Sequence, residues 1–400
     1  MGDGVNEVGN RFAERVTHLA PEGAYEVLAK AQALEAEGRD VVHLEIGQPD
    51  VPTFDNVAGA GIRAIEEGRT RYNPPKGVDA LREAVAEDAG RRRGIEVKAS
   101  EVVVVPGAKP MLFFPTMTLV EPGDEVIYPD PGFPTYAAMI GVAGGVPKPV
   151  RLREETGFAF DLDAFDKAVG DRTRLIILNS PGNPTGGVLP EDVLMHVAEA
   201  AQRHDAWVLS DEIYMRLTYD GAEAVSIATL DGMRERTIIC DGFSKTYAMT
   251  GWRLGYGVMP EDLADRMGLL LTHSIGCTAT FTQYAGLEAL TGPQEQVDEV
   301  VAEYQRRRDV LVEGLNGMEG VHCQVPQGAF YAFPNITAFG RSSAWMADYL
   351  LEEAGVAVLP GTAFGAGGEG YLRVCFANSM ERIGVALERI DAAVTALHVA

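Results

Sequence analysis

Residues 237–256 read TIICDGFSKTYAMTGWRLGY, in which an apolar β-branched run is followed by a lysine and then an arginine. The run 237–240 predicts a buried strand, so Ser244 and Lys245 are expected where that strand ends. Arg253 follows at the start of a second strand-like run, 254–259. An amine can form a Schiff base and a guanidinium can clamp phosphate oxygens, so the pair suits a ligand with a carbonyl and a phosphate group. Alone, the pattern is more typical of a solvated loop lysine and an ordinary strand arginine.

The strand before Lys245 belongs to a series of short apolar runs that alternate with helical segments. These runs are 102–105, 125–128, 175–178, 207–210 and 237–240. Strands that are apolar throughout are buried on both faces, and the helices between them supply the crossovers. The sequence therefore predicts an α/β fold, with a mostly parallel sheet covered by helices.

Candidate ligand-binding residues follow these runs, at the ends of the predicted strands. They are Gly107, Ala108 and Lys109, the segment 179–183, Asp211 with Tyr214, and Ser244 with Lys245. In open α/β sheets, ligands bind in the crevice at the carboxyl ends of the strands. We therefore expect these separate loops to converge on one site, which favours a functional role for Lys245.

The pattern changes beyond about residue 295. A long helix over 294–316 is followed by short strands near His322, at 330–333 and at 371–376. This arrangement predicts a large domain over 46–295 and a smaller α+β domain over 296–400. The N-terminal segment 1–45 is expected to join the smaller domain.

The composition is that of an ordinary globular protein, with 46% hydrophobic and 23% charged residues. Its net charge of −24 argues against nucleic acid and against anionic membrane surfaces, which both attract basic proteins. Its four cysteines contain no CxxC pair, so neither a disulfide framework nor a metal site is expected, and Cys240 and Cys375 are expected to be buried. Residues 1–16 lack the apolar core of a signal peptide, and no apolar run reaches about 18 residues. We expect a cytoplasmic protein without a membrane span.

Six motifs lie in order along the chain: GQPD at 47–50, YNPPKG at 72–77, NSPGNPTG at 179–186, SDEIY at 210–214, SKTYAMTGWRLGY at 244–256 and YLRVCFA at 371–377. In this order and spacing they resemble the pyridoxal-phosphate-dependent aminotransferases of class I/II. The resemblance covers nearly the whole chain. It implies the fold-type-I architecture, with a large cofactor-binding domain and a smaller α+β domain.

The resemblance implies that Lys245 forms the Schiff base with pyridoxal 5′-phosphate and later moves a proton as general base. It implies that Asp211 pairs with the pyridine nitrogen and keeps the ring protonated, which makes the cofactor an electron sink. Tyr214 and Asn183 match the residues that contact the ring oxygen O3′. The alternatives are a helix N-cap for Asp211 and a simple Pro/Gly turn for the loop around Asn183.

A phosphate site is implied at the start of a helix. Gly107, Ala108 and Lys109 precede a helix that is expected to begin at Pro110, and free backbone N–H groups at such a terminus bind anions. Arg253 matches the family's phosphate arginine.

Two further cofactor contacts are implied, and one departs from the family pattern. Ser244 is a candidate hydroxyl donor to the phosphate. Many relatives carry Ser or Thr where this chain has Gly242, so Ser244 or water is expected to take over that hydrogen bond. Phe133 resembles the aromatic residue that stacks on the pyridine ring, with core packing as the alternative.

Arg373 lies within the apolar run 371–376. A guanidinium in such a strand is costly unless it binds an anion, and the resemblance implies that this anion is the substrate α-carboxylate. Gly47 resembles the backbone contact to the same carboxylate.

The resemblance also implies a homodimer with shared active sites. Tyr72 matches the tyrosine that reaches the phosphate of the neighbouring subunit, and Thr280 is expected to do the same. Two-fold dimers are the commonest closed assemblies.

The favoured reaction is transfer of an amino group between an L-α-amino acid and a 2-oxo acid. Elimination, replacement or carbon–carbon bond formation with the same cofactor is the alternative, because fold does not decide function. A non-catalytic cofactor-binding regulator is disfavoured by the negative charge and the lack of a DNA-binding module. Lys109 matches a residue that binds a distal carboxylate in aspartate-using relatives, and Glu22 would repel such a group if it points inward.

Overall fold

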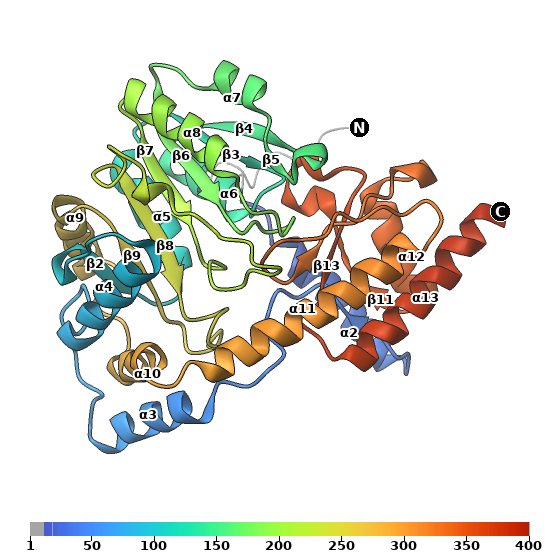
Figure 1. The fold of residues 1–400 in the computed structure, drawn as a ribbon, viewed down its shortest axis with the longest axis horizontal. Helices are drawn as coiled ribbons and strands as arrows, with labels where there is room; N and C mark the ends of the chain where they lie inside the picture. The colour runs from blue at the N-terminus through green and yellow to red at the C-terminus, as the bar shows by residue number, and fades with distance from the viewer. Residues whose placement is uncertain (1–11, 18, 400) are drawn as a thin grey trace.

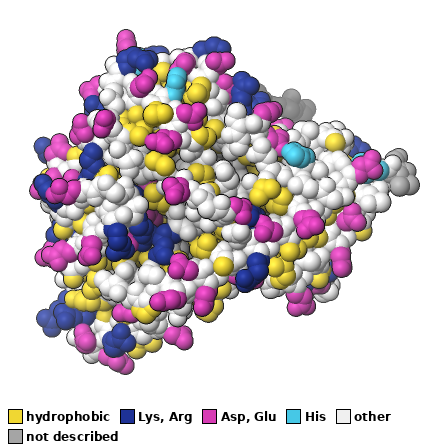
Figure 2. All heavy atoms as spheres, in the orientation of Figure 1, with side chains coloured by type: hydrophobic (Ala, Val, Ile, Leu, Met, Phe, Trp, Pro, Cys, Tyr) yellow, Lys and Arg dark blue, Asp and Glu magenta, His cyan; other side chains and the backbone are white. Residues whose placement is uncertain are grey.

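The computed structural model describes residues 12–17 and 19–399. Residues 1–11, on which most of the expectation about a signal peptide depends, lie outside the described residues, as does that part of the predicted 1–45 segment. Within the described ranges, no helix has both the length and the apolar character needed to span a bilayer. Asp and Glu side chains are scattered over the face seen in Figure 2.

A sheet of eight strands, in the order β2-β9-β8-β7-β6-β3-β4-β5, forms the larger part of the molecule (Figure 1). Its strands are β2 (Val102–Val105), β3 (Glu125–Asp130), β4 (Val146–Arg153), β5 (Ala159–Phe160), β6 (Thr173–Asn179), β7 (Trp207–Asp211), β8 (Thr237–Gly242) and β9 (Gly255–Val258). The neighbouring strands β8, β7, β6, β3 and β4 run parallel, whereas β9 is antiparallel to both β2 and β8. The predicted α/β fold with a mostly parallel sheet is confirmed.

Helices cover both faces of this sheet. Their bounds are α3 (Asp55–Glu66), α4 (Asp79–Arg93), α5 (Lys109–Leu119), α6 (Thr135–Ala143), α7 (Leu162–Ala168), α8 (Glu191–Arg203), α9 (Glu261–Thr272) and α10 (Thr280–Thr291). Side chains alternate along a strand, so Ile238 and Cys240 pack with α5, α6 and α9, while Ile239 packs with α4 and α10. The burial expected for Cys240 is confirmed.

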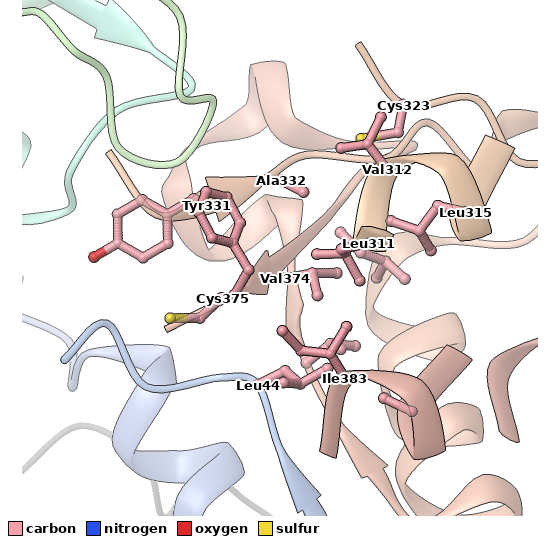
Figure 3. Close-up of a cluster of buried hydrophobic side chains, with 14 of the residues drawn as sticks. Leu44, Leu311, Val312, Leu315, Cys323, Tyr331, Ala332, Val374, Cys375 and Ile383 are labelled. Atoms are coloured by element: carbon pink, nitrogen blue, oxygen red, sulfur yellow. The ribbon is translucent and has the colours of Figure 1, made fainter. Parts of the chain in front are cut away.

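A second hydrophobic core lies among the C-terminal elements (Figure 3). Its elements are β1 (Val42–His43), β10 (Tyr331–Ala332), β11 (Val356–Ala357), β12 (Leu359–Pro360), β13 (Leu372–Cys375), α11 (Glu295–Asn316), α12 (Ser343–Ala354) and α13 (Met380–Val399). Helix α11 runs from the neighbourhood of α10 toward this core in Figure 1. Leu44, Leu311, Val374 and Ile383 meet in it, and the predicted burial of Cys375 is confirmed.

The N-terminal part contacts both parts of the molecule. Helix α1 (Glu14–Thr17) contacts α6, whereas α2 (Gly23–Ala36) contacts β11 and β12, and β1 pairs in parallel with β11. Tyr214 and Leu217, from the segment after β7, belong to the same core. Because that segment contributes to both parts of the molecule, the domain boundaries after residues 45 and 295 stay predictions.

Two local predictions need correction or addition. The sequence also predicts an amphipathic helix over 79–93 with Asp79 as its cap. In the structure Asp79 is instead the first residue of α4, and Val78 occupies the cap position. Strand β4 was not predicted, because Pro147 and Pro149 lack N–H donors and disfavour a strand in sequence. In the structure β4 lies between β3 and the two-residue β5, so its prolines stand beside the edge of the sheet.

Candidate active site

The carboxyl ends of three neighbouring parallel strands meet at one place. Asn179 ends β6 and pairs in register with Asp211, which ends β7 and pairs with Cys240 on β8. Lys245 lies just after the end of β8. The expected convergence of these loops follows from the strand order β8-β7-β6, because parallel strands end at the same edge of a sheet.

Lys245 is half-buried, and its amine faces the segment that follows β1. Its Nζ donates a hydrogen bond to the Gly47 carbonyl at 2.5 Å. The amine lies 5.8 Å from the ring centre of Tyr214 and 5.5 Å from that of Phe330. Burial lowers the pKa of Lys245 to about 8. A much larger fraction of this amine is therefore neutral near pH 7 than for an ordinary lysine, as a nucleophile or base requires.

Asp211 is buried, and its Oδ2 accepts a hydrogen bond from the Tyr136 hydroxyl at 2.8 Å. Burial raises the pKa of Asp211 to about 6. The residues after it form a turn, and its Oδ1 accepts only a long bond of 3.4 Å from the Ile213 N–H. The helix-cap alternative for Asp211 is therefore wrong. Tyr136 was not singled out in the sequence, although it follows Phe133 by one helical turn.

Tyr214 is buried, and its hydroxyl lies 2.7 Å from that of Tyr331. Tyr331 comes from β10 in the second core, so this contact joins the two parts of the molecule. Burial raises the pKa of Tyr214 well above its usual range. The phenol therefore stays protonated and can donate a hydrogen bond. Tyr331 was missed because its neighbours in sequence form an ordinary apolar run.

Arg373 on β13 is 4% exposed, and its guanidinium is only partly satisfied. Nη1 donates to Oδ1 of Asn183 at 3.1 Å, and Nη2 donates to the Glu45 carbonyl. The guanidinium carbon lies 4.5 Å from the ring centre of Tyr331. Nε is buried and finds no hydrogen-bond partner among residues 12–17 and 19–399. An open, buried N–H of this kind suits an anionic ligand.

Gly47 lies against the same tyrosine. A Cβ atom at Gly47 would come within 2.2 Å of the Tyr331 hydroxyl oxygen. Only glycine therefore lets this backbone approach Tyr331 while its carbonyl accepts the bond from Lys245.

The start of α5 and Arg253 form one cradle. A Cβ atom at Gly107 would lie 2.1 Å from Arg253 Nη2, and Gly107 has a φ of +80°. Arg253 itself has a φ of +53°, and its Nη1 donates to the Thr250 carbonyl at 2.8 Å. Ala108 is the N-cap residue of α5, so the first N–H groups of the helix and the guanidinium meet at one spot. This geometry suits a phosphate group.

The departure at Gly242 has a steric reason. A Cβ atom there would lie 3.0 Å from the Cα of Gly255 on β9, which leaves little room for a hydroxyl side chain. Ser244 is buried nearby in the turn after β8.

Phe133 and Lys109 lie side by side at the rim of this region. The Lys109 Nζ is 5.2 Å from the ring centre of Phe133 and forms an ion pair with the Glu22 carboxylate. Phe133 also packs edge-on against Tyr136, with ring centres 5.8 Å apart. Glu22 therefore neutralises Lys109.

Tyr72 and Thr280 lie on one surface. Tyr72 is 96% exposed, so it makes almost no contact with its own chain. The Thr280 hydroxyl donates to the Arg71 carbonyl at 2.6 Å and accepts from Asn73 Nδ2 at 2.9 Å. The two residues expected to act on a partner subunit are thus held together. Nowhere in the described part of the chain do three or more His, Cys, Asp or Glu side chains gather as metal ligands would.

Known proteins are similar to this chain in both sequence and fold. The model of the family "Aminotransferase class I and II" matches residues 39–390. A probable aspartate/prephenate aminotransferase of Aquifex aeolicus is 41% identical over 96% of this chain and 98% of that protein. An aromatic-amino-acid aminotransferase of Thermococcus litoralis is 38% identical over 95% of this chain and 97% of that protein.

A solved structure shows that the similarity extends to the fold. The structure of the aspartate aminotransferase from Thermus thermophilus with maleate superposes with a TM-score of 0.91 at 39% identity, covering 96% of this chain and 99% of that one. The chain belongs to the class I and II aminotransferase family.

Proposed function

We propose that this protein uses pyridoxal 5′-phosphate to transfer an amino group between an L-α-amino acid and a 2-oxo acid. The observation that carries the proposal is the meeting of one amine, one carboxylate and one guanidinium in a single buried site. These groups belong to Lys245, Asp211 and Arg373. Each suits a different part of the reacting complex.

The residues present fit the cofactor. The cradle of Gly107 and Arg253 would hold its phosphate, and the buried carboxylate of Asp211 would hold its pyridine nitrogen. Tyr214 and Asn183 would contact the ring oxygen, with Phe133 beside the ring. When bound, the cofactor supplies a carbonyl for the amines and an electron sink for the pair left when the substrate Cα loses its proton.

The chain's own residues bind the substrate and move the proton. Arg373 would bind the α-carboxylate through its open Nε and its Nη groups. The freed amine of Lys245 would take the proton from Cα and return it at the other end of the reacting system. The segment from Glu45 to Gly47 supports both groups, because its carbonyls accept from Arg373 and from Lys245.

The assembly and location belong to the same proposal. In a homodimer, Tyr72 and Thr280 would reach the phosphate bound by the partner, which accounts for the exposure of Tyr72. The segment 1–45 would move with a smaller domain over 296–400, against a larger domain over 46–295. The acidic, cysteine-poor composition suits the cytoplasm.

A single half-reaction tests the proposal. Purified protein with bound cofactor receives glutamate or alanine and no oxo acid. Transamination should release one 2-oxo acid per site and leave the cofactor as its amine, pyridoxamine 5′-phosphate. Elimination needs an amino acid with a leaving group, so a parallel reaction receives serine; release of ammonia and a 2-oxo acid with the cofactor unchanged would there indicate elimination. A panel of oxo acids added afterwards would identify the acceptor.

A further inference from the structure

A buried ionic network lies behind the sheet, on the face opposite Asp211. Its centre is Arg93, the last residue of α4, whose side chain is 0% exposed. Arg93 Nε donates to Glu212 Oε2 at 2.6 Å, and Nη2 donates to Asp241 Oδ2 at 2.9 Å. One arginine therefore holds two buried carboxylates that come from different strand ends.

Both carboxylates are also bound from other directions. Glu212 Oε1 accepts from the hydroxyls of Ser210 at 2.8 Å and Ser226 at 2.6 Å. Asp241 Oδ2 accepts from the Tyr256 hydroxyl at 3.0 Å. Because they are buried and accept several hydrogen bonds, each of the two carboxylates is held in one position.

The carboxylates of Glu212 and Asp241 lie close in sequence to Asp211 and Lys245. Glu212 follows Asp211 directly, and Asp241 lies on β8, which leads to Lys245. Because side chains alternate along a strand, Asp211 points to one face of the sheet while Glu212 and Asp241 point to the other. The ends of β7 and β8 thus carry the site on one face and the network on the other.

We infer that Arg93 is a positioning residue of the active site: it fixes the ends of β7 and β8 that carry Asp211 and Lys245, and it offsets two carboxylates so that Asp211 stays ionised. The inference rests on the proposed function, since it assigns Arg93 to the group that holds the cofactor's pyridine nitrogen.

The charges of the network predict the direction in which the pKa of Asp211 should change in each variant. With Arg93 in place, the network carries one net negative charge; without Arg93 it carries two, and with Asp241→Asn it carries none. Negative charges on Glu212 and Asp241 raise the pKa of Asp211, which burial already raises. Removing Arg93 should therefore favour the protonated form of Asp211, and removing the Asp241 charge should favour the ionised form.

Other groups facing Asp211 are unchanged by these substitutions. They are Tyr136 on α6, Cys240 on β8, and Tyr214 and Lys245 in the loops of the site. A change in pH dependence can therefore be assigned to the network.

The test compares the holoenzymes of wild type, Arg93→Met, Asp241→Asn and the matched control Arg308→Met. Arg308 is also buried, with 2% of its side chain exposed, and is paired with Asp220 and Asp309 away from the site. The measurements are the rate of cofactor release into an excess of a cofactor-binding trap from pH 5 to pH 9, and the melting temperature. The rate of release should rise as the pH falls and Asp211 takes up a proton. We call this rising part of the pH profile the acid limb.

In Arg93→Met, the acid limb of cofactor release should move to higher pH by about one unit, which is about a tenfold faster release at a fixed pH on that limb. In Asp241→Asn it should move to lower pH. Arg308→Met should lower the melting temperature and leave the limb in place. A limb that stays fixed in both network variants, or moves equally in the control, overturns the inference.

If Arg93→Met does not fold, Asp241→Asn decides the question alone. A shift to lower pH supports the inference, and an unchanged limb or a shift to higher pH overturns it. A wild-type protein that holds no cofactor would contradict the proposed function itself. A wild type that transaminates, with network variants that behave like the control, would contradict only the role of Arg93.

Discussion

The end of the candidate site that holds Lys245, Asp211 and Arg373 is largely buried, whereas the end at Arg253 and Tyr72 is open. Asp211 and Arg373 are 5% and 4% exposed, and their partners come from the same chain. Arg253 is exposed, and so is Tyr72, at 96%. The loop of Tyr72 is held by a hydrogen bond from the Thr280 hydroxyl to the Arg71 carbonyl. The difference is the one that the proposed dimer would produce: one chain would complete the groups for proton transfer, and a second chain would close the end at Arg253.

The largest effect should come from the buried end. Lys245→Ala should remove the covalent link to the cofactor and lower turnover by about 10²–10⁴-fold or more, because the general base is lost as well. Trapping the link with borohydride, followed by mass spectrometry, measures the first effect. Lys30→Ala, an exposed lysine paired with Asp348, serves as the control. A reducible link that persists in Lys245→Ala would contradict the assignment.

Asp211→Asn tests the same end with a smaller change. The shape is kept, but the charge proposed to face the pyridine nitrogen is lost, so turnover should fall by about 10²–10³-fold while some cofactor stays bound. Steady-state rates and the cofactor content of the purified variant measure the two effects. Unchanged turnover would mean that the buried carboxylate has only a structural role.

The burial of Lys245 also predicts a pH dependence. Its pKa is lowered to about 8, so the neutral amine grows about tenfold from pH 7 to pH 9, against about a hundredfold for an ordinary lysine. The rate of covalent cofactor attachment to the apoprotein should rise by the smaller factor and level off above pH 8. A lysine model compound corrects for titration of the cofactor. A hundredfold rise would show that the amine is not desolvated.

The open end should give the smallest effect. Tyr72→Phe removes one hydroxyl and should weaken cofactor binding by about 2–10-fold, the worth of one hydrogen bond. In hybrid dimers with Lys245→Ala, the site that keeps Lys245 receives an intact Tyr72 from the partner and should regain native affinity. If subunits exchange and affinity is not regained, Tyr72 does not act on the partner's site, and the two ends differ only in exposure.

The sequence by itself determined most of the elements, β4 excepted, and the motif residues. The helix predicted over 79–93 and the strand predicted over 102–105 coincide with α4 and β2. Apolar runs and helical spacing are local properties, so they can be recognised without knowing what packs on them. The loops after the strands were expected to converge for a topological reason, and the parallel order β8-β7-β6 brings three of them together.

Only the tertiary structure decided which side chains complete the site. Tyr331 contacts Tyr214, and Arg93 contacts Glu212 and Asp241, across more than a hundred residues of sequence in each case. Nothing in the neighbourhood of Tyr331 or Arg93 distinguishes them from core and surface residues of their types. Their partners depend on which strands and helices lie side by side, and the strand order is not the order of the chain. The chemistry of each residue is local, whereas its partner is set by the packing of the whole molecule.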